Sequence, residues 1–209
     1  MKLITIFAAT AMLVSGASAM AATPVSVTAT GSGWINAGGT TNSGGFDRGV
    51  HNTYTQDGSY NDYFDFAAIG QKVSAATLNI WSNQNNSAYD PTAVYSVHAP
   101  SAFTYAGLAN GASLGSVTGG VADTGTGHYV GITLDALGVA YLNAHSSTAV
   151  HFGGTATGNA QFFGYTTGYP VATLTVTPGV PEPATWSMLV SGFGLVGVMT
   201  RRRAKAVCA

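Results

Sequence analysis

The chain has 209 residues, enough for one domain with short appendages. Charged residues make up only 7% of it, against about 25% in an ordinary soluble domain. The cations gather at the two ends, at Lys2 and at residues 201–205, and only Arg48 and Lys72 lie between. A body with so few cations cannot neutralise phosphates, which excludes nucleic acid as a partner.

Residues 1–21 have the features of a signal peptide. Lys2 precedes an uncharged run, residues 3–14, that suits a signal sequence but is too short to span a bilayer. Small residues follow, and Ala17-Ser18-Ala19 fits a cleavage site, with Ala19-Met20-Ala21 as the second choice. The export machinery and signal peptidase are therefore predicted partners. The alternative interpretation is a buried core helix.

Residues 22–178 form the predicted body, in which short alternating segments are separated by Gly, Asn, Ser and Pro clusters. Alternation of apolar and polar residues with period two, rich in β-branched and aromatic side chains, predicts strands. The segments are residues 25–30, 72–81, 94–98, 129–134, 148–152, 160–165 and 171–176. Many short strands predict an all-β fold, a jelly-roll-like β-sandwich.

One segment of the body predicts a helix instead. Asp135 can cap the N-terminus of a short helix over residues 136–144. In that helix we expect Leu137 and Tyr141 to face the core.

Two tryptophans are candidate ligand-binding residues. Trp81 alternates with Leu78 and Ile80, so its ring points away from their face and can form a platform for a sugar ring. Trp34 is the second candidate. The alternative, which we favour, is that such rings pack within the sandwich, because a sandwich buries both inner faces.

A local group of carboxylates lies around a Gly58-Ser59 turn and consists of Asp57, Asp62 and Asp65. Oxygen-rich clusters can bind Ca²⁺, which takes six to eight ligands. Aspartates also cap turns through their own backbone, and we favour that interpretation. The sequence thus predicts no metal site beyond this weak calcium candidate.

Catalytic patterns are missing from the body. It has no glutamate and no Gly-x-Ser-x-Gly motif. The histidines are dispersed: His51, His98, His128, His145 and His151. His151 alternates with Val150 and Phe152 and should face away from them. We therefore predict no enzyme and no cofactor, with a hydrolase as a minor alternative.

The last segment, residues 179–209, has the features of a membrane-directed tail. It opens with Pro181, Glu182, Pro183 and Trp186. The 18 residues from Pro183 to Thr200 are uncharged and would form a helix about 27 Å long, near the thickness of a bilayer core. We place the apolar transmembrane helix at residues 184–200 and a basic stop at residues 201–205, in which Arg201, Arg202 and Arg203 stay cytoplasmic.

This arrangement resembles the PEP-CTERM sorting tail of Gram-negative bacteria, in its Pro-Glu-Pro-x-x-Trp variant, which is also labelled an ice-binding protein C-terminal domain. The resemblance implies an exosortase protease that removes the tail, and a role around exopolysaccharide or biofilm. It also implies an inner-membrane intermediate on the way to the periplasm, cell surface or extracellular matrix. The alternative is an ordinary tail anchor that the mature protein keeps.

The body shows a second, weaker resemblance. Gly33-Trp34, residues 60–66 and residues 73–80 are similar to the opening of jelly-roll bodies attached to PEP-CTERM tails and to the DNRLRE-type carbohydrate-associated sandwich. That resemblance implies that strands near Val27 and Leu174 lie side by side. The sequence as a whole predicts a non-enzymatic envelope or matrix protein, with a carbohydrate-binding module as the alternative.

Overall fold

The computed structural model describes residues 22–41, 55–56, 58–82, 92–118, 128–157, 161–162, 170–179 and 190–194. Within these residues no helix is long and apolar enough to cross a membrane. Residues 190–194 form one short, exposed helical stretch inside the predicted transmembrane segment. Several predicted features lie outside the described residues: the predicted signal peptide, Asp57, Pro181, Glu182, Pro183, Trp186 and the three arginines of the predicted stop.

The body is built almost wholly from strands. These are β1 (Val25–Asn36), β2 (Thr55–Gln56), β3 (Tyr60–Phe66), β4 (Val73–Ser82), β5 (Val94–His98), β6 (Ser113–Thr118), β7 (His128–Thr133), β8 (Val150–Thr157), β9 (Gln161–Phe162) and β10 (Thr173–Pro178). In the described part of the body two helices join them, α1 (Tyr105–Ala109) and α2 (Ala136–Ala144). The predicted all-β class is confirmed.

The strands pair as a long hairpin folded back on itself. β1 pairs with β10, β3 with β8, β4 with β7, and β5 with β6, all antiparallel. Nested pairs of this kind define a jelly roll, so the predicted architecture is confirmed in its topology as well as in its class. The first and last strands are neighbours, with Val27 opposite Leu174 as predicted.

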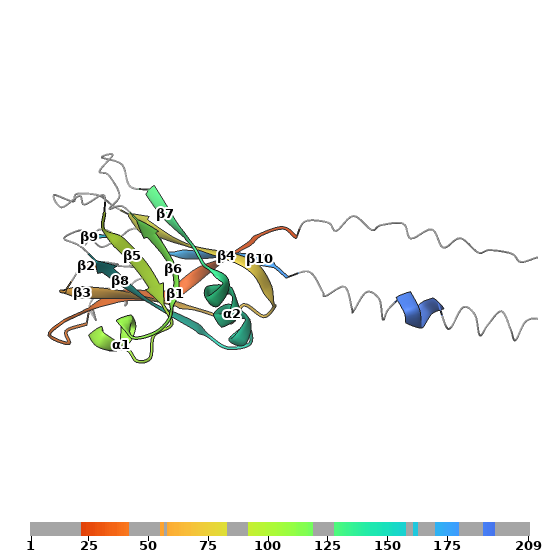
Figure 1. Cartoon of the computed structure of the whole chain (residues 1–209), viewed down its shortest axis with the longest axis horizontal. Helices are drawn as coiled ribbons and strands as arrows, with labels where there is room; N and C mark the ends of the chain where they lie inside the picture. The colour runs from red at the N-terminus through yellow and green to blue at the C-terminus, as the bar shows by residue number, and fades with distance from the viewer. Residues whose placement is uncertain are drawn as a thin grey trace, which may run out of the picture.

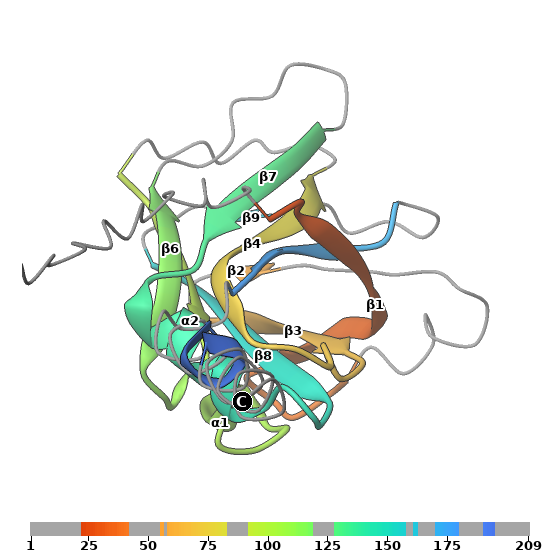
Figure 2. The ribbon, with the colours of Figure 1, turned by 90° about the vertical axis from the view of Figure 1, so that its right-hand side faces the viewer.

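Two sheets share β1. Sheet A has the order β1-β10-β4-β7, and sheet B the order β1-β3-β8-β5-β6 (Figure 1). Residues 25–28 of β1 pair with β10, whereas residues 29–36 pair with β3, and the register shifts between Ala29 and Gly31. An irregularity of this kind bends a strand, and Figure 2 shows β1 curving from β10 to β3. β1 therefore closes one side of the sandwich.

The core lies between the two sheets because the strands alternate. In β3, Phe64 and Phe66 are fully buried, whereas Tyr63 and Asp65, which alternate with them along the strand, are partly exposed. Sheet A contributes Leu78, Ile80, Ile132, Leu174 and Val176 to the same cluster. Burial of these apolar side chains supplies the main driving force for folding.

α2 begins as predicted and turns a different face to the core. The Asp135 carboxylate accepts a hydrogen bond from the Gly138 main chain at 2.9 Å, so Asp135 is its N-cap. The expectation for Leu137 is wrong, because its side chain is 58% exposed. Gly138 and Leu142, four residues apart on one helix face, are buried instead. Tyr141 is half-buried and contacts the sheet.

Some strands differ from their predicted extents. β2, β3 and β6 were not among the segments predicted as strands, and β1 runs on to Asn36, six residues beyond the expected end. The segment expected at residues 160–165 is described only as the two-residue strand β9. Gly, Ser and Thr dominate the sequences Gly31–Gly33 and Ser113–Thr118, so that neither carries an alternating apolar pattern.

Candidate functional site

An aromatic pair lies on the outer face of sheet A. Trp81 of β4 stands directly opposite Tyr129 of β7. The two rings meet edge to face, with their centroids 5.1 Å apart. Trp81 is half-buried, Tyr129 is 44% exposed, and the Tyr129 hydroxyl donates to the main-chain oxygen of Val171 at 3.2 Å. The pair therefore presents aromatic surface to solvent in a fixed orientation.

The two predicted ligand-binding tryptophans are not brought together. Trp34 lies on the inner side of β1, is 8% exposed and packs edge-on against Tyr60 with centroids 5.1 Å apart. Trp81 points outward from the other sheet, and its buried indole Nε1 has no hydrogen-bond partner among the described residues. Of the two, only Trp81 has the exposure that a ligand platform needs.

The described aspartates of the calcium candidate also lie apart. Asp62 and Asp65 are three residues apart in β3, so their side chains point to opposite faces. Asp62 is fully buried, whereas Asp65 is on the outer face. Among the described residues no three His, Cys, Asp or Glu side chains gather in a way that could hold a metal ion.

Asp62 belongs to a buried polar group inside the sandwich. Tyr95 of β5 donates its hydroxyl to Asp62 Oδ1 at 2.8 Å. Burial raises the pKa of the Asp62 carboxyl to about 7, against the opposing effect of the hydrogen bond with Tyr95. Burial also raises the pKa of the Tyr95 hydroxyl well above its usual value. At neutral pH this carboxyl is therefore near its titration midpoint.

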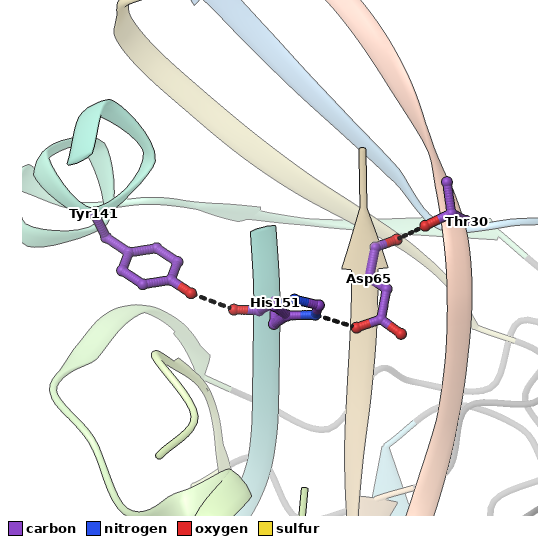
Figure 3. Close-up of polar contacts among 4 residues, drawn as sticks. All are labelled: Thr30, Asp65, Tyr141 and His151. Carbon is purple, nitrogen blue, oxygen red and sulfur yellow. Dashed lines mark hydrogen bonds and ion pairs between the residues drawn. The ribbon is translucent and has the colours of Figure 1, made fainter. Parts of the chain in front are cut away.

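A second polar pair, which the sequence did not reveal, lies on the outer face of sheet B. Asp65 of β3 and His151 of β8 are opposite each other, and His151 Nδ1 lies 2.6 Å from Asp65 Oδ1 (Figure 3). Since a carboxylate only accepts hydrogen bonds, Nδ1 carries the proton of this bond. The prediction that His151 faces away from Val150 and Phe152 is confirmed, because both are fully buried.

Neighbouring groups hold this pair in place. Tyr141 of α2 donates its hydroxyl to the His151 main-chain oxygen at 2.8 Å, and Thr30 of β1 donates to the Asp65 main-chain oxygen at 3.2 Å (Figure 3). The Phe103 ring meets His151 edge to face, with centroids 5.4 Å apart. Nucleophilic catalysis needs a hydroxyl or thiol beside the histidine. No described residue places a side-chain hydroxyl in hydrogen-bond contact with this ring.

Comparison with known protein families identifies the tail. A family model for the PEP-CTERM protein-sorting motif matches residues 179–203. This segment contains Pro181, Glu182, Pro183, Trp186 and the arginines, so the predicted sorting tail is confirmed. No curated protein matches the chain.

The molecule is thus an exported jelly-roll protein of a Gram-negative-type envelope. It carries a PEP-CTERM sorting motif, which implies exosortase as its processing partner. The match does not extend to the body, so the resemblance of residues 33–80 to the DNRLRE-type sandwich stays a prediction.

Proposed function

We propose that the chain is a non-enzymatic protein of the cell envelope or extracellular matrix, released by exosortase-type cleavage of its tail and associated with exopolysaccharide. The sorting motif at residues 179–203 carries this proposal. Proline lacks an N–H donor and restricts the residue before it to extended backbone. The Pro-Glu-Pro sequence therefore suits an extended peptide in a protease groove beside the membrane.

The body is arranged for attachment at one end. Val25 of β1 is paired with Val176 of β10, so the chain enters and leaves the sandwich side by side (Figure 1). The predicted signal peptide and the sorting tail are continuous with these two strand ends. A body held there projects its other end away from the membrane. Cleavage of the tail would then release or transfer a finished domain.

A second candidate function is a carbohydrate-binding module. The exposed edge of the Trp81–Tyr129 pair supports it, because flat apolar rings suit the apolar face of a sugar. Trp81 is eight residues from Val73 along β4, about 27 Å at about 3.4 Å per residue. The pair therefore lies far from the strand ends that join the tail.

Fractionation of the native host tests the proposal. We expect the processed protein in the exopolysaccharide fraction of wild-type cells, and the unprocessed chain in the inner membrane of cells that lack exosortase. The same distribution in both strains would contradict sorting through the tail. Processed protein that separates completely from exopolysaccharide would contradict the association while leaving the sorting intact.

A further inference from the structure

The outer face of sheet A has an ordered, uncharged surface around the aromatic pair. The register aligns Ser26, Thr175, Thr77 and Thr133 in one row across β1, β10, β4 and β7. The next row contains Thr28, Thr173, Asn79 and Gly131, and the row beyond it contains Trp81 and Tyr129. We call these ten positions the hydroxyl face.

Hydrogen bonds fix part of this surface. The Ser26 and Thr175 hydroxyls are 3.0 Å apart, and Asn79 Nδ2 donates to Thr175 Oγ1 at 3.0 Å. A hydroxyl has one donor and two acceptor sites, so each still has capacity for an outside partner. Ser26, Thr28 and Thr133 are exposed. Because Gly131 has no side chain, its row projects less far from the sheet at the position next to Tyr129.

Charge defines the partner that such a surface accepts. None of the ten positions is an Asp, Glu, Lys, Arg or His, whereas the outer face of sheet B carries Asp65, His151 and His98. An anionic polymer would need cations to offset the loss of its counterions and hydration. Hydroxyl and amide groups beside exposed rings instead match a polymer that has both hydroxyls and apolar ring faces.

We propose that the hydroxyl face binds a neutral polysaccharide, with Tyr129 and Trp81 stacking on sugar rings and the Ser, Thr and Asn rows bonding to sugar hydroxyls. This deepens, and rests on, the proposed association with exopolysaccharide. The rows span about 14 Å across four strands spaced about 4.8 Å apart, so the surface is wide. It therefore fits an extended or layered glycan, and a small free sugar would contact only a fraction of it.

The test is affinity electrophoresis of the mature protein from host culture, in gels that contain the neutral fraction of the host exopolysaccharide or, in parallel, anionic alginate. We expect retardation by the neutral polymer that is insensitive to added NaCl, since screening acts only on charges. Tyr129→Ala should weaken it on the order of tenfold, as loss of an aromatic anchor does. Thr133→Val, which removes one exposed hydroxyl, should weaken it less.

Phe103→Ala is the matched control, because Phe103 is 50% exposed and lies on the outer face of sheet B. It should leave retardation unchanged, and thermal unfolding of each variant checks that the fold persists. Equal retardation of Tyr129→Ala and the parent would place the glycan elsewhere and overturn the hydroxyl face, while the association itself would stand. Absence of retardation by the neutral polymer, or salt-sensitive retardation by alginate alone, would contradict the proposal that the ligand is a neutral polysaccharide. Neither result would bear on the proposed sorting through the tail.

Discussion

Tyr95 of β5 donates a hydrogen bond to Asp62 of β3 over the intervening strand β8, on the buried face of sheet B, at 2.8 Å between the hydroxyl and Oδ1. Both side chains are fully buried. A charge there lacks water, and hydrogen bonds replace only part of its hydration. The pair therefore links the stability of the jelly roll to pH.

Asp62 predicts a loss of stability as the pH rises. Its folded pKa is raised from 3.8 to about 7, so between these values the unfolded chain ionises while the folded protein keeps the proton. The folded state then binds more protons, and the free energy of unfolding falls by up to about 4 kcal/mol across this window. In Asp62→Asn that contribution should vanish. Denaturant titrations of both proteins from pH 4 to pH 8 measure it, and parallel profiles would contradict it.

Gly154 of β8 lies against the same pair. A Cβ added there would lie 1.9 Å from both Asp62 Oδ1 and the Tyr95 hydroxyl. Gly154→Ala should therefore destabilise the fold by about 1–3 kcal/mol through overpacking. Gly131→Ala is the matched control, because its Cβ would meet nothing nearer than 3.3 Å. Urea unfolding of the two variants should separate them clearly, and similar midpoints would refute the close approach.

The Asp65–His151 pair should contribute little to stability despite its short distance. Its side chains are 27% and 41% exposed, and water screens such a pair. A double-mutant cycle with Asp65→Asn and His151→Gln should give a coupling below about 1 kcal/mol that decreases further with salt. A coupling several times larger would indicate that the pair is a principal support of sheet B.

Asp135 should stabilise α2 as its N-cap. Asp135→Ala removes the acceptor for the Gly138 N–H and should cost about 1 kcal/mol. Asp135→Ser keeps a capping oxygen and should retain most of the stability. Thermal unfolding of the two variants measures the difference, and equal midpoints would show that the cap is dispensable.

The local patterns in the sequence predicted much of the fold. Alternation placed β4, β5, β7 and β10 within one or two residues of their observed bounds, because in each an apolar face packs on the core. β6 was missed because Ser113–Thr118 has few apolar residues. Leu137 was misplaced because a helix with apolar residues on several sides does not define its buried face.

The candidate site was harder to predict. Trp81 could be assigned to an outer face from its strand period alone, but its partner Tyr129 depends on the pairing of β4 with β7. Asp65 and His151 are 86 residues apart, and only the antiparallel register of β3 and β8 makes them neighbours. Asp62 shares the buried face of β3 with Phe64 and Phe66, but its carboxyl group interrupts the apolar alternation by which a buried face is predicted. Functional and strained positions escape pattern analysis in this way.

The most direct test of the sorting function is the intact mass of the mature protein from its native host. Exosortase processing predicts a mass that ends near Pro181–Pro183 and lacks Arg201, Arg202 and Arg203, in a chain that has also lost its signal peptide. A mature chain that still carries the three arginines would show that the tail is a lasting anchor, and would contradict release by exosortase together with the link to exopolysaccharide built on it.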